Sequence, residues 1–220
     1  MLSAPLWCGL AAAFSVAAGP RMPALQSGDV VLQTSHSAQS AAIQQATHSP
    51  FSHVGVVEVA DDGVFVIEAI QPVSRTPVAR WRARGAGGKW TVLRRPDLTD
   101  EAAAKVVGEA KKMLGRPYDL LLRWDDERLY CSELVAKAFQ RGAGISVGKM
   151  QKVRDLDLRG LLPAIQKRYG PAVPLDQELL TPASIAGDPG FTVLEDDFVT
   201  RSAKGSAEDR RPAHRAGRAR

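Results

Sequence analysis

Two β-rich runs on either side of an Asp-Gly turn form the clearest local pattern in the chain. Residues 52–59 and 64–70 are rich in valine, isoleucine and phenylalanine, and the four residues between them are Ala-Asp-Asp-Gly. β-branched and aromatic residues favour strands, and an Asp-Gly pair favours a tight turn. The pattern therefore predicts an antiparallel hairpin. Two other short apolar runs predict further strands, at residues 28–34 and 91–94.

The length of the hairpin loop decides which of its side chains share a face. With an even loop, of either two or four residues, His53 lies opposite Ile70 and Glu68 is its diagonal neighbour on the same face. An odd loop would place His53 and Glu68 on opposite faces of the sheet. The sequence therefore predicts a contact between these two side chains if the loop is even.

Helical patterns dominate the middle of the chain. Residues 100–114 form the longest, which Thr99 or Asp100 can cap and Gly115 can end. Its expected apolar stripe includes Ala104, Val107 and Leu114. Shorter helices are expected at residues 37–47 and 132–140, the second after the loop Arg116-Pro117-Tyr118-Asp119.

The last third of the chain has a weaker pattern. Pro163 prevents residues 156–169 from forming one regular helix, because proline lacks the amide hydrogen that the helix interior needs. Prolines at 171, 174, 182 and 189 then interrupt the following segment. The pattern predicts an irregular region there, with no element that we can assign.

Composition and charge indicate one globular domain with a basic tail. A chain of 220 residues with 45% hydrophobic and 24% charged residues is long enough for a full core, and we expect the domain to span residues 20–195. The formal net charge of +5 is unevenly placed, because arginines concentrate in residues 196–220 among Ala, Gly, Ser and Pro. Such a segment is typical of disorder. We expect no specific nucleic-acid partner, and the oligomeric state is left open.

Residues 1–19 resemble a signal peptide. They are apolar and rich in alanine, and Val16-Ala17-Ala18 offers the small residues that a signal peptidase accepts. The apolar stretch is too short to span a bilayer comfortably. No lysine or arginine precedes it, so a cytoplasmic location stands as the alternative to export into the periplasm or beyond. Cleavage after Ala18 would remove Cys8 and leave Cys131 as the single thiol.

Cys131 is the strongest candidate for a reactive group. It lies where a polar loop becomes the apolar-periodic run 132–140, so its thiol falls in the first turn of the expected helix. Free amide hydrogens and the positive end of the helix dipole favour a thiolate there. A small buried hydrophobic residue is the alternative interpretation of a lone cysteine. A thiol nucleophile also needs a base and a group that orients the base.

His53 and Glu68 are the candidates for the base and for the group that orients it. His53 is the histidine at the start of a buried β-run, although a strand histidine is often structural. Glu68 stands among Val66, Ile67, Ala69 and Ile70, where a carboxylate is costly unless a donor meets it. We therefore expect that removing this charge, as in Glu68→Gln, leaves stability unchanged or raises it.

Several motifs, in this order, resemble a known family. They are Gly28-Asp29-Val30-Val31, Gln39-Ser40 with Ile43 and Thr47, Ser52-His53-Val54-Gly55-Val56-Val57, Ile67-Glu68-Ala69, Gly115-Arg116-Pro117-Tyr118-Asp119 and Tyr130-Cys131-Ser132-Glu133-Leu134-Val135. Over residues 27–142 the chain resembles the YiiX-like branch of the circularly permuted papain-fold hydrolases, relatives of the NlpC-type cysteine peptidases. The region after Gly144 matches no motif of that family and is where specificity could reside.

The resemblance implies an α+β fold in which an antiparallel sheet packs against helices, one of which carries the nucleophilic cysteine. It implies that Cys131 is the nucleophile, His53 the general base and Glu68 the group that orients the imidazole. Tyr118 becomes a candidate for binding the substrate or oxyanion, with loop packing as its alternative role. The implied activity is hydrolysis of an amide or ester through a thioester, with no cofactor.

Other functions stay open. An acyltransferase would use the same three residues, and a non-catalytic binding module would keep the fold without the chemistry. A metal site is disfavoured because one cysteine and dispersed histidines offer no closely spaced ligand pair. Gly85, Gly87 and Gly88 lack the spacing of a phosphate-binding loop. Cell-wall peptides, lipid-linked amides and N-acyl amino acids all remain candidate substrates.

Overall fold

The computed structural model describes residues 23–37 and 39–199. The expected signal peptide and the tail beyond residue 199 lie outside this part. The fold continues past the expected boundary at residue 195, because the last strand ends at Asp196 and the amide of Asp197 donates to the Trp90 carbonyl at 3.0 Å. None of the helices in the described part is long and apolar enough to cross a membrane.

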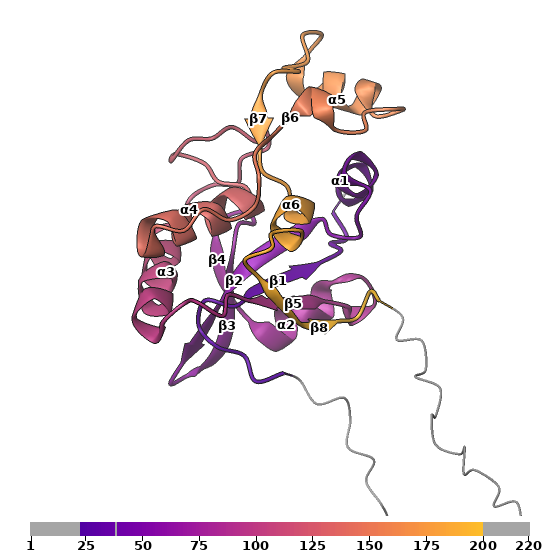
Figure 1. Cartoon of the computed structure of the whole chain (residues 1–220). Helices are drawn as coiled ribbons and strands as arrows, with labels where there is room; N and C mark the ends of the chain where they lie inside the picture. Colours follow the sequence, from indigo (N-terminus) through magenta and orange to yellow (C-terminus); the bar gives the residue numbers. More distant parts are fainter. Residues whose placement is uncertain (1–22, 38, 200–220) are drawn as a thin grey trace, which may run out of the picture.

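A six-stranded antiparallel sheet forms the centre of the molecule (Figure 1). Its strand order is β4-β3-β2-β1-β5-β8, so β2 and β1 are the central pair. The strands are β1 (Val30–Gln33), β2 (His53–Ala60), β3 (Gly63–Glu68), β4 (Ser74–Pro77), β5 (Thr91–Arg94) and β8 (Thr192–Asp196).

The predicted hairpin is confirmed, and its loop is even. Ala60 pairs with Gly63, which leaves a two-residue loop, and Val56 pairs with Ile67 further along. Gly63 has a φ of +133°, a conformation that glycine adopts without strain. This register places His53 and Glu68 on one face of the sheet.

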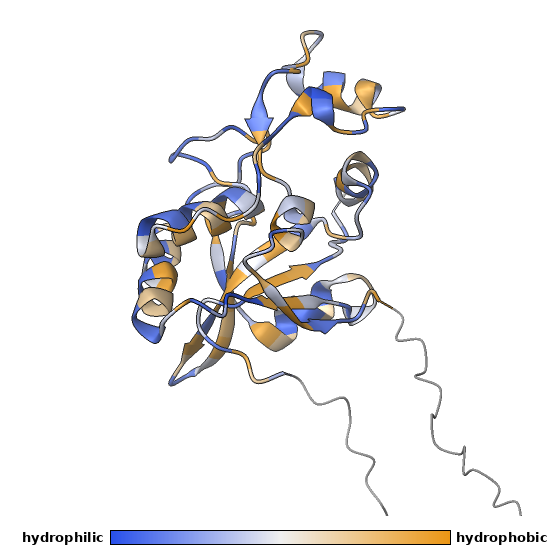
Figure 2. Cartoon of the chain, viewed as in Figure 1, coloured by the Kyte–Doolittle hydropathy of each residue, from blue (hydrophilic) through white to orange (hydrophobic). Residues whose placement is uncertain are grey.

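Helices cover both faces of the sheet. On one face lie α3 (Asp100–Lys112) and α4 (Cys131–Ala143), which pack on alternate strand residues such as Val54, Val56 and Ile67. On the other face lies α2 (Val78–Arg84), which packs on the intervening residues with Trp81 and Trp90. Figure 2 shows the hydrophobic colour concentrated on the central strands, with mixed colours on α3 and α4. This arrangement confirms the predicted α+β class.

The predicted stripe of α3 is partly wrong. Thr99 caps the helix as expected, since its side chain accepts from the Ala102 amide. However, Ala104 and Leu114 are exposed, and the buried positions are Ala103, Val106, Val107 and Ala110. The helix ends at Lys112, so Leu114 follows the last turn and does not continue the stripe.

Residues 150–182, which we call the cap, rise above the sheet next to α1 (Ser40–Thr47) (Figure 1). The cap contains β6 (Gln151–Lys152), η2 (Val153–Asp155), α5 (Leu162–Tyr169) and β7 (Glu178–Leu179). Pro163 occupies the first turn of α5, where its missing amide hydrogen costs nothing. The segment predicted as irregular thus contains β7, then α6 (Pro182–Ala186) and β8; η1 (Ala86–Gly88) completes the elements.

Polar contacts join the cap to α1. The Asp157 amide donates to the Ala46 carbonyl at 3.0 Å, and Arg168 Nη1 donates to Gln39 Oε1 at 3.2 Å. His48, the C-cap residue that follows α1, lies 3.2 Å from the Asp157 carboxylate. The cap and α1 together therefore form a roof above the end of the sheet where β2 begins.

Candidate active site

Cys131 is the first residue of α4, as predicted. A bridge between Tyr118 and Leu129 brings the preceding loop back to the start of the helix, and α4 then packs along β2. The thiol is buried, with 4% of the residue exposed. The thiol therefore lies in the first helical turn, whose amide hydrogens lack carbonyl partners within the helix, and it is largely removed from water.

His53 and Glu68 meet as the hairpin register predicts. His53 begins β2, Glu68 ends β3, and His53 Nε2 lies 2.5 Å from Glu68 Oε2. The imidazole stacks on the Trp81 ring with 6.2 Å between centroids. Because Nε2 is engaged by the carboxylate, Nδ1 is the ring nitrogen left for Cys131.

Glu68 is fully buried but well supplied with donors. Besides His53, Oε2 accepts from Trp81 Nε1 at 3.0 Å and Arg84 Nη2 at 2.5 Å, and Oε1 accepts from Thr76 Oγ1 at 2.6 Å. Charge-assisted hydrogen bonds of this kind favour the ionised carboxylate. The sequence indicated that Glu68 needs a donor; the structure provides four.

The pKa shifts within the three residues support one another. Burial alone would lower the pKa of His53, but its interactions with Cys131 and Glu68 raise that pKa to about 9. Burial alone would raise the pKa of Cys131, but the neighbouring His53 lowers it. For Glu68, burial is outweighed by His53, Arg84 and Thr76, and the pKa falls to about 2. The arrangement favours a thiolate, an imidazolium and a carboxylate.

Tyr118 lies between two cavities that meet at this site. Its amide donates to Gln71 Oε1 at 2.7 Å, which fixes the loop beside the strand ends. Burial and the nearby Cys131 raise the pKa of its hydroxyl, so the hydroxyl stays protonated and available as a donor. The position fits substrate binding, and its ring also packs against the core, so both roles proposed for it are compatible.

The first cavity, the apolar cavity, contains Cys131 in its wall. Its volume is about 220 Å³. Hydrocarbon side chains from α1, α5 and the rest of the cap supply most of the lining. The lining residues include Ala42, Ile43, Ala46, Tyr118, Leu122, Val153, Leu156, Leu158, Leu161, Ile165, Leu179 and Leu180, with Gln39 and Arg168 among the polar ones.

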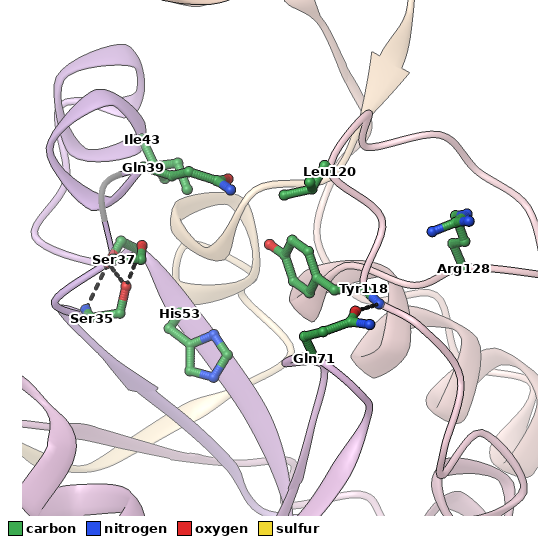
Figure 3. Close-up of a pocket in the computed structure, with 10 residues that line it drawn as sticks. Ser35, Ser37, Gln39, Ile43, His53, Gln71, Tyr118, Leu120 and Arg128 are labelled. Carbon is green, nitrogen blue, oxygen red and sulfur yellow. Dashed lines mark hydrogen bonds between the residues drawn. The ribbon is translucent and has the colours of Figure 1, made fainter. Parts of the chain in front are cut away.

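The second cavity, the polar cavity, contains His53 in its wall. Its volume is about 390 Å³, and it is lined by Ser35, Ser37, Gln39, Ile43, Ser52, His53, Gln71, Tyr118, Leu120 and Arg128. Figure 3 shows His53 and Tyr118 beside the same space, with Ser35 and Ser37 on one side and Gln71 and Arg128 on the other. Gln39, Ile43 and Tyr118 belong to both linings, so they separate the two cavities.

Sequence reasoning identified His53 as a partner of Glu68, but not the other three donors and not most of the cavity walls. Thr76, Trp81 and Arg84 come from β4 and α2, and their side chains meet Glu68 only after the chain has folded back over the sheet. The cap residues lie in the segment whose pattern was weak. One signal was available: a buried carboxylate implies donors, although not which residues provide them.

A comparison of the chain with known families decides its relationship. Residues 24–194 match the family described as permuted papain-like amidase enzyme, YaeF/YiiX, C92 family. The chain belongs to this family. Membership confirms the resemblance and the permuted papain-like fold, in which the histidine and its acidic neighbour precede the cysteine. It also supports a function of the cysteine hydrolase type.

Relatives from Escherichia coli agree with this assignment. The uncharacterized protein YiiX of strain K12 is 38% identical over 176 residues, which cover 79% of this chain and 87% of YiiX. A crystal structure of yiiX from strain O157:H7 has a TM-score of 0.75, at 38% identity, and the match covers 78% of this chain and 97% of that one.

That crystal structure is described as one of a metalloprotein. Protein metal sites usually combine three or more histidine, cysteine, aspartate or glutamate ligands. Within residues 23–37 and 39–199 of this chain, such side chains nowhere gather in groups of three or more that could hold a metal ion. The described residues of this chain therefore do not fit a metal centre.

Proposed function

We propose that the protein is a cysteine amidase that hydrolyses N-acyl amines with an aliphatic acyl group through a thioester on Cys131. One observation carries this proposal: Cys131 opens into the apolar cavity. An acyl carbon bonded to Sγ must place the rest of the acyl group there. Leucine and isoleucine walls favour a hydrocarbon chain over the polar peptide of a cell wall. Among the candidate substrates, lipid-linked amides and other N-acyl amines fit best.

In the first step the Cys131 thiolate attacks the amide carbon. The C–S bond forms and the carbonyl π electrons move to oxygen. As the intermediate collapses, the C–N bond breaks and His53 Nδ1 donates its proton to the leaving nitrogen. The products are a free amine, an acyl thioester and a neutral imidazole.

In the second step His53 accepts a proton from water as the water oxygen attacks the thioester carbon. The C–S bond breaks, the fatty acid leaves, and the thiolate and imidazolium are restored. Glu68 stays ionised throughout, because its pKa is far below that of His53. Its role in the proposal is to hold the imidazole orientation and stabilise its positive charge.

Two donors would bind the oxyanion between these steps. The amide hydrogen of Cys131 lies in the first turn of α4, where helix geometry leaves it without a carbonyl partner in the helix. The Tyr118 hydroxyl, protonated and adjacent to both cavities, is the second candidate. Donors fixed before the reaction lower the barrier because they need no reorganisation.

The chemical proposal is tested with N-octanoyl and N-acetyl amides of one amine. The wild-type protein should release octanoate and show an acyl adduct by intact mass, and Cys131→Ala should do neither. His53→Ala should lose roughly 10²–10⁴-fold in kcat/KM. His48→Ala is the matched control, because His48 is exposed on the roof and lies outside both cavity linings. If Cys131 carried no acyl adduct and Cys131→Ala kept the wild-type turnover, the role of Cys131 as nucleophile would be contradicted.

The acyl assignment has its own test. Ile165 lines the apolar cavity, and Leu175 is an exposed cap residue outside its lining. Ile165→Gln should lower the ratio of octanoyl to acetyl hydrolysis, whereas Leu175→Gln should leave it unchanged. Equal rates for both acyl groups in the wild-type protein would refute the aliphatic substrate class. Adding an alcohol acceptor shows whether the thioester is passed to an acceptor in preference to water, as in an acyltransferase.

A further inference from the structure

The nucleophile and the base lie in the walls of different cavities. Cys131 belongs to the apolar lining and His53 to the polar one, and Tyr118 stands between them. In amide cleavage the atom that leaves the acyl carbon must receive a proton from the base. If the acyl group occupies the apolar side, the leaving nitrogen and its substituents therefore extend into the polar cavity.

Several side chains that line the polar cavity have hydrogen-bond donors available. Gln71 Oε1 is already used by the Tyr118 amide, and Gln39 Oε1 by Arg168. Each glutamine therefore has its NH₂ group left to donate. Arg128 adds a guanidinium, and none of the ten lining residues is an aspartate or glutamate.

Hydrogen bonds hold the serines of the polar cavity in position without a ligand. Ser52 is buried, its Oγ accepts from the Ser35 amide at 2.8 Å, and it lies 2.6 Å from Ser40 Oγ. This network positions Ser35 and the neighbouring Ser37, whose hydroxyl groups lie 3.0 Å apart. A site that combines preset hydroxyls, amide NH₂ groups and a guanidinium suits a ligand with negatively charged oxygens.

From this geometry we infer that the polar cavity is the leaving-group subsite and takes an amine that bears an anionic substituent, a carboxylate or a phosphate. The inference rests on the proposed function and specifies the second half of the substrate. Arg128 is the specificity-determining residue, because it is the only permanent cation in the lining. The substrate is thus an amide with a hydrocarbon end and an acidic end.

A matched series of octanoyl amides tests the inference. The leaving groups are glycine, phosphoethanolamine, ethanolamine and ethylenediamine, which carry a carboxylate, a phosphate, no charge and a positive charge. For the wild-type protein, kcat/KM should be at least roughly tenfold higher for the better anionic amide than for the ethanolamide, and lowest for the cationic amide. The order of glycine and phosphoethanolamine identifies the source of the charge.

Two variants localise the preference. Arg128→Gln should reduce the ratio of anionic to neutral kcat/KM roughly tenfold. Arg123→Gln removes an exposed arginine of the same loop that lines neither cavity, and it should keep the wild-type ratio. Equal rates for anionic and neutral amides, or an unchanged ratio in Arg128→Gln, would overturn the inference while leaving the amidase proposal intact.

A binding measurement separates failure of the inference from failure of the proposed function. Calorimetry with Cys131→Ala compares octanoylglycine with octanoylethanolamine in the absence of chemistry. Tighter binding of octanoylglycine supports the subsite even if the wild-type protein hydrolyses none of the four amides, in which case the amidase proposal alone fails. Equal affinity, or no binding of either amide, overturns the subsite.

Discussion

Glu68 and Glu133 are both fully buried glutamates, yet their pKa values move in opposite directions. The pKa of Glu68 falls to about 2, because four donors outweigh its burial. The pKa of Glu133, in the first turn of α4, rises to about 7, because burial outweighs its partner Lys137. The difference shows that burial by itself does not determine the charge of a carboxylate.

The contacts of the two groups explain this contrast. Glu133 Oε2 accepts a long 3.4 Å bond from the Tyr130 amide. Lys137 Nζ forms an ion pair with Oε1 at 2.7 Å, but it is shared with Asp126. These contacts stabilise the ionised form of Glu133 only weakly. In Glu68, by contrast, both carboxylate oxygens accept hydrogen bonds that stabilise the ionised form. We therefore expect Glu68 to act in the candidate active site and Glu133 to stabilise the start of α4.

The largest expected difference is in catalysis. Glu68→Gln removes the charge that stabilises the His53 imidazolium, so kcat/KM should fall on the order of 10²–10³-fold. Glu133→Gln changes a group that does not contact His53, so kcat/KM should stay within roughly threefold of the wild-type value. Both rates are measured on the same octanoyl amide at pH 7. A larger loss of kcat/KM in Glu133→Gln than in Glu68→Gln would contradict the assignment of the catalytic role to Glu68.

The next difference is in stability. The folded-state pKa of Glu68 lies below its ordinary 4.5, so its contribution is present above pH 4.5 and is lost as the pH falls through about 2. Glu68→Gln should therefore lower the free energy of unfolding at pH 8, by on the order of a few kcal/mol, and the loss should shrink as the pH falls toward 2. From the sequence we expected removal of this charge to be neutral or stabilising; the four donors that meet the carboxylate lead to the opposite expectation.

Glu133 should show the opposite dependence. Its folded-state pKa lies above 4.5, so its ionisation destabilises the protein as the pH rises from 4.5 through about 7. Glu133→Gln should be neutral at pH 4 and stabilising at pH 8. Urea unfolding of both variants at the two pH values checks the signs, and a loss of stability in Glu133→Gln that grows with pH would contradict them.

A third prediction concerns the pH dependence of the reaction. Because the pKa of His53 is raised to about 9, the imidazolium persists through neutral pH, and activity should decline only as the pH rises through about 9. In Glu68→Gln this basic limb should move toward the ordinary histidine value near 6.5, since one of the raising partners is gone. The kcat/KM profile from pH 5 to 10 measures the basic limb of the wild-type protein and of the variant. A limb unchanged in Glu68→Gln would mean that Glu68 does not act through His53.

The smallest effect is expected at Arg84. Its guanidinium shares Glu68 Oε2 with His53 and Trp81, but its side chain is 40% exposed, so water screens part of its charge. Arg84→Gln should lower kcat/KM only roughly three- to tenfold, and Arg84→Lys should restore part of the loss. Arg80→Gln, an exposed arginine of the same helix, is the control. A loss as large as that of Glu68→Gln would show that Arg84 is required to keep the carboxylate charged.

Local rules were enough to predict the central contact of the site. The turn Ala60-Asp61-Asp62-Gly63 determines the hairpin register, and the register determines that His53 meets Glu68. The change from loop to apolar run likewise located Cys131 at a helix start. Both inferences need only a few neighbouring residues, which is why they could be made from sequence.

The surroundings of these residues follow from packing between distant segments. Trp81 reaches Glu68 because α2 folds onto the sheet face that carries Val57 and Val66, and no local period encodes that docking. The cap was missed for a related reason: its strands have two residues each, and Pro163 in the first turn of α5 obscures the helical pattern. The walls of both cavities therefore required the structure.

The cap leaves the core after α4 and returns at α6 and β8, where Ile185 is fully buried and β8 pairs with β5. Both of its ends are thus fastened to the part of the molecule that holds Cys131, His53 and Glu68. Lengthening a segment with fixed ends costs little, about 0.6 kcal/mol for each doubling of a flexible loop. The length of the cap can therefore change at small cost while the residues that position Cys131, His53 and Glu68 stay in place.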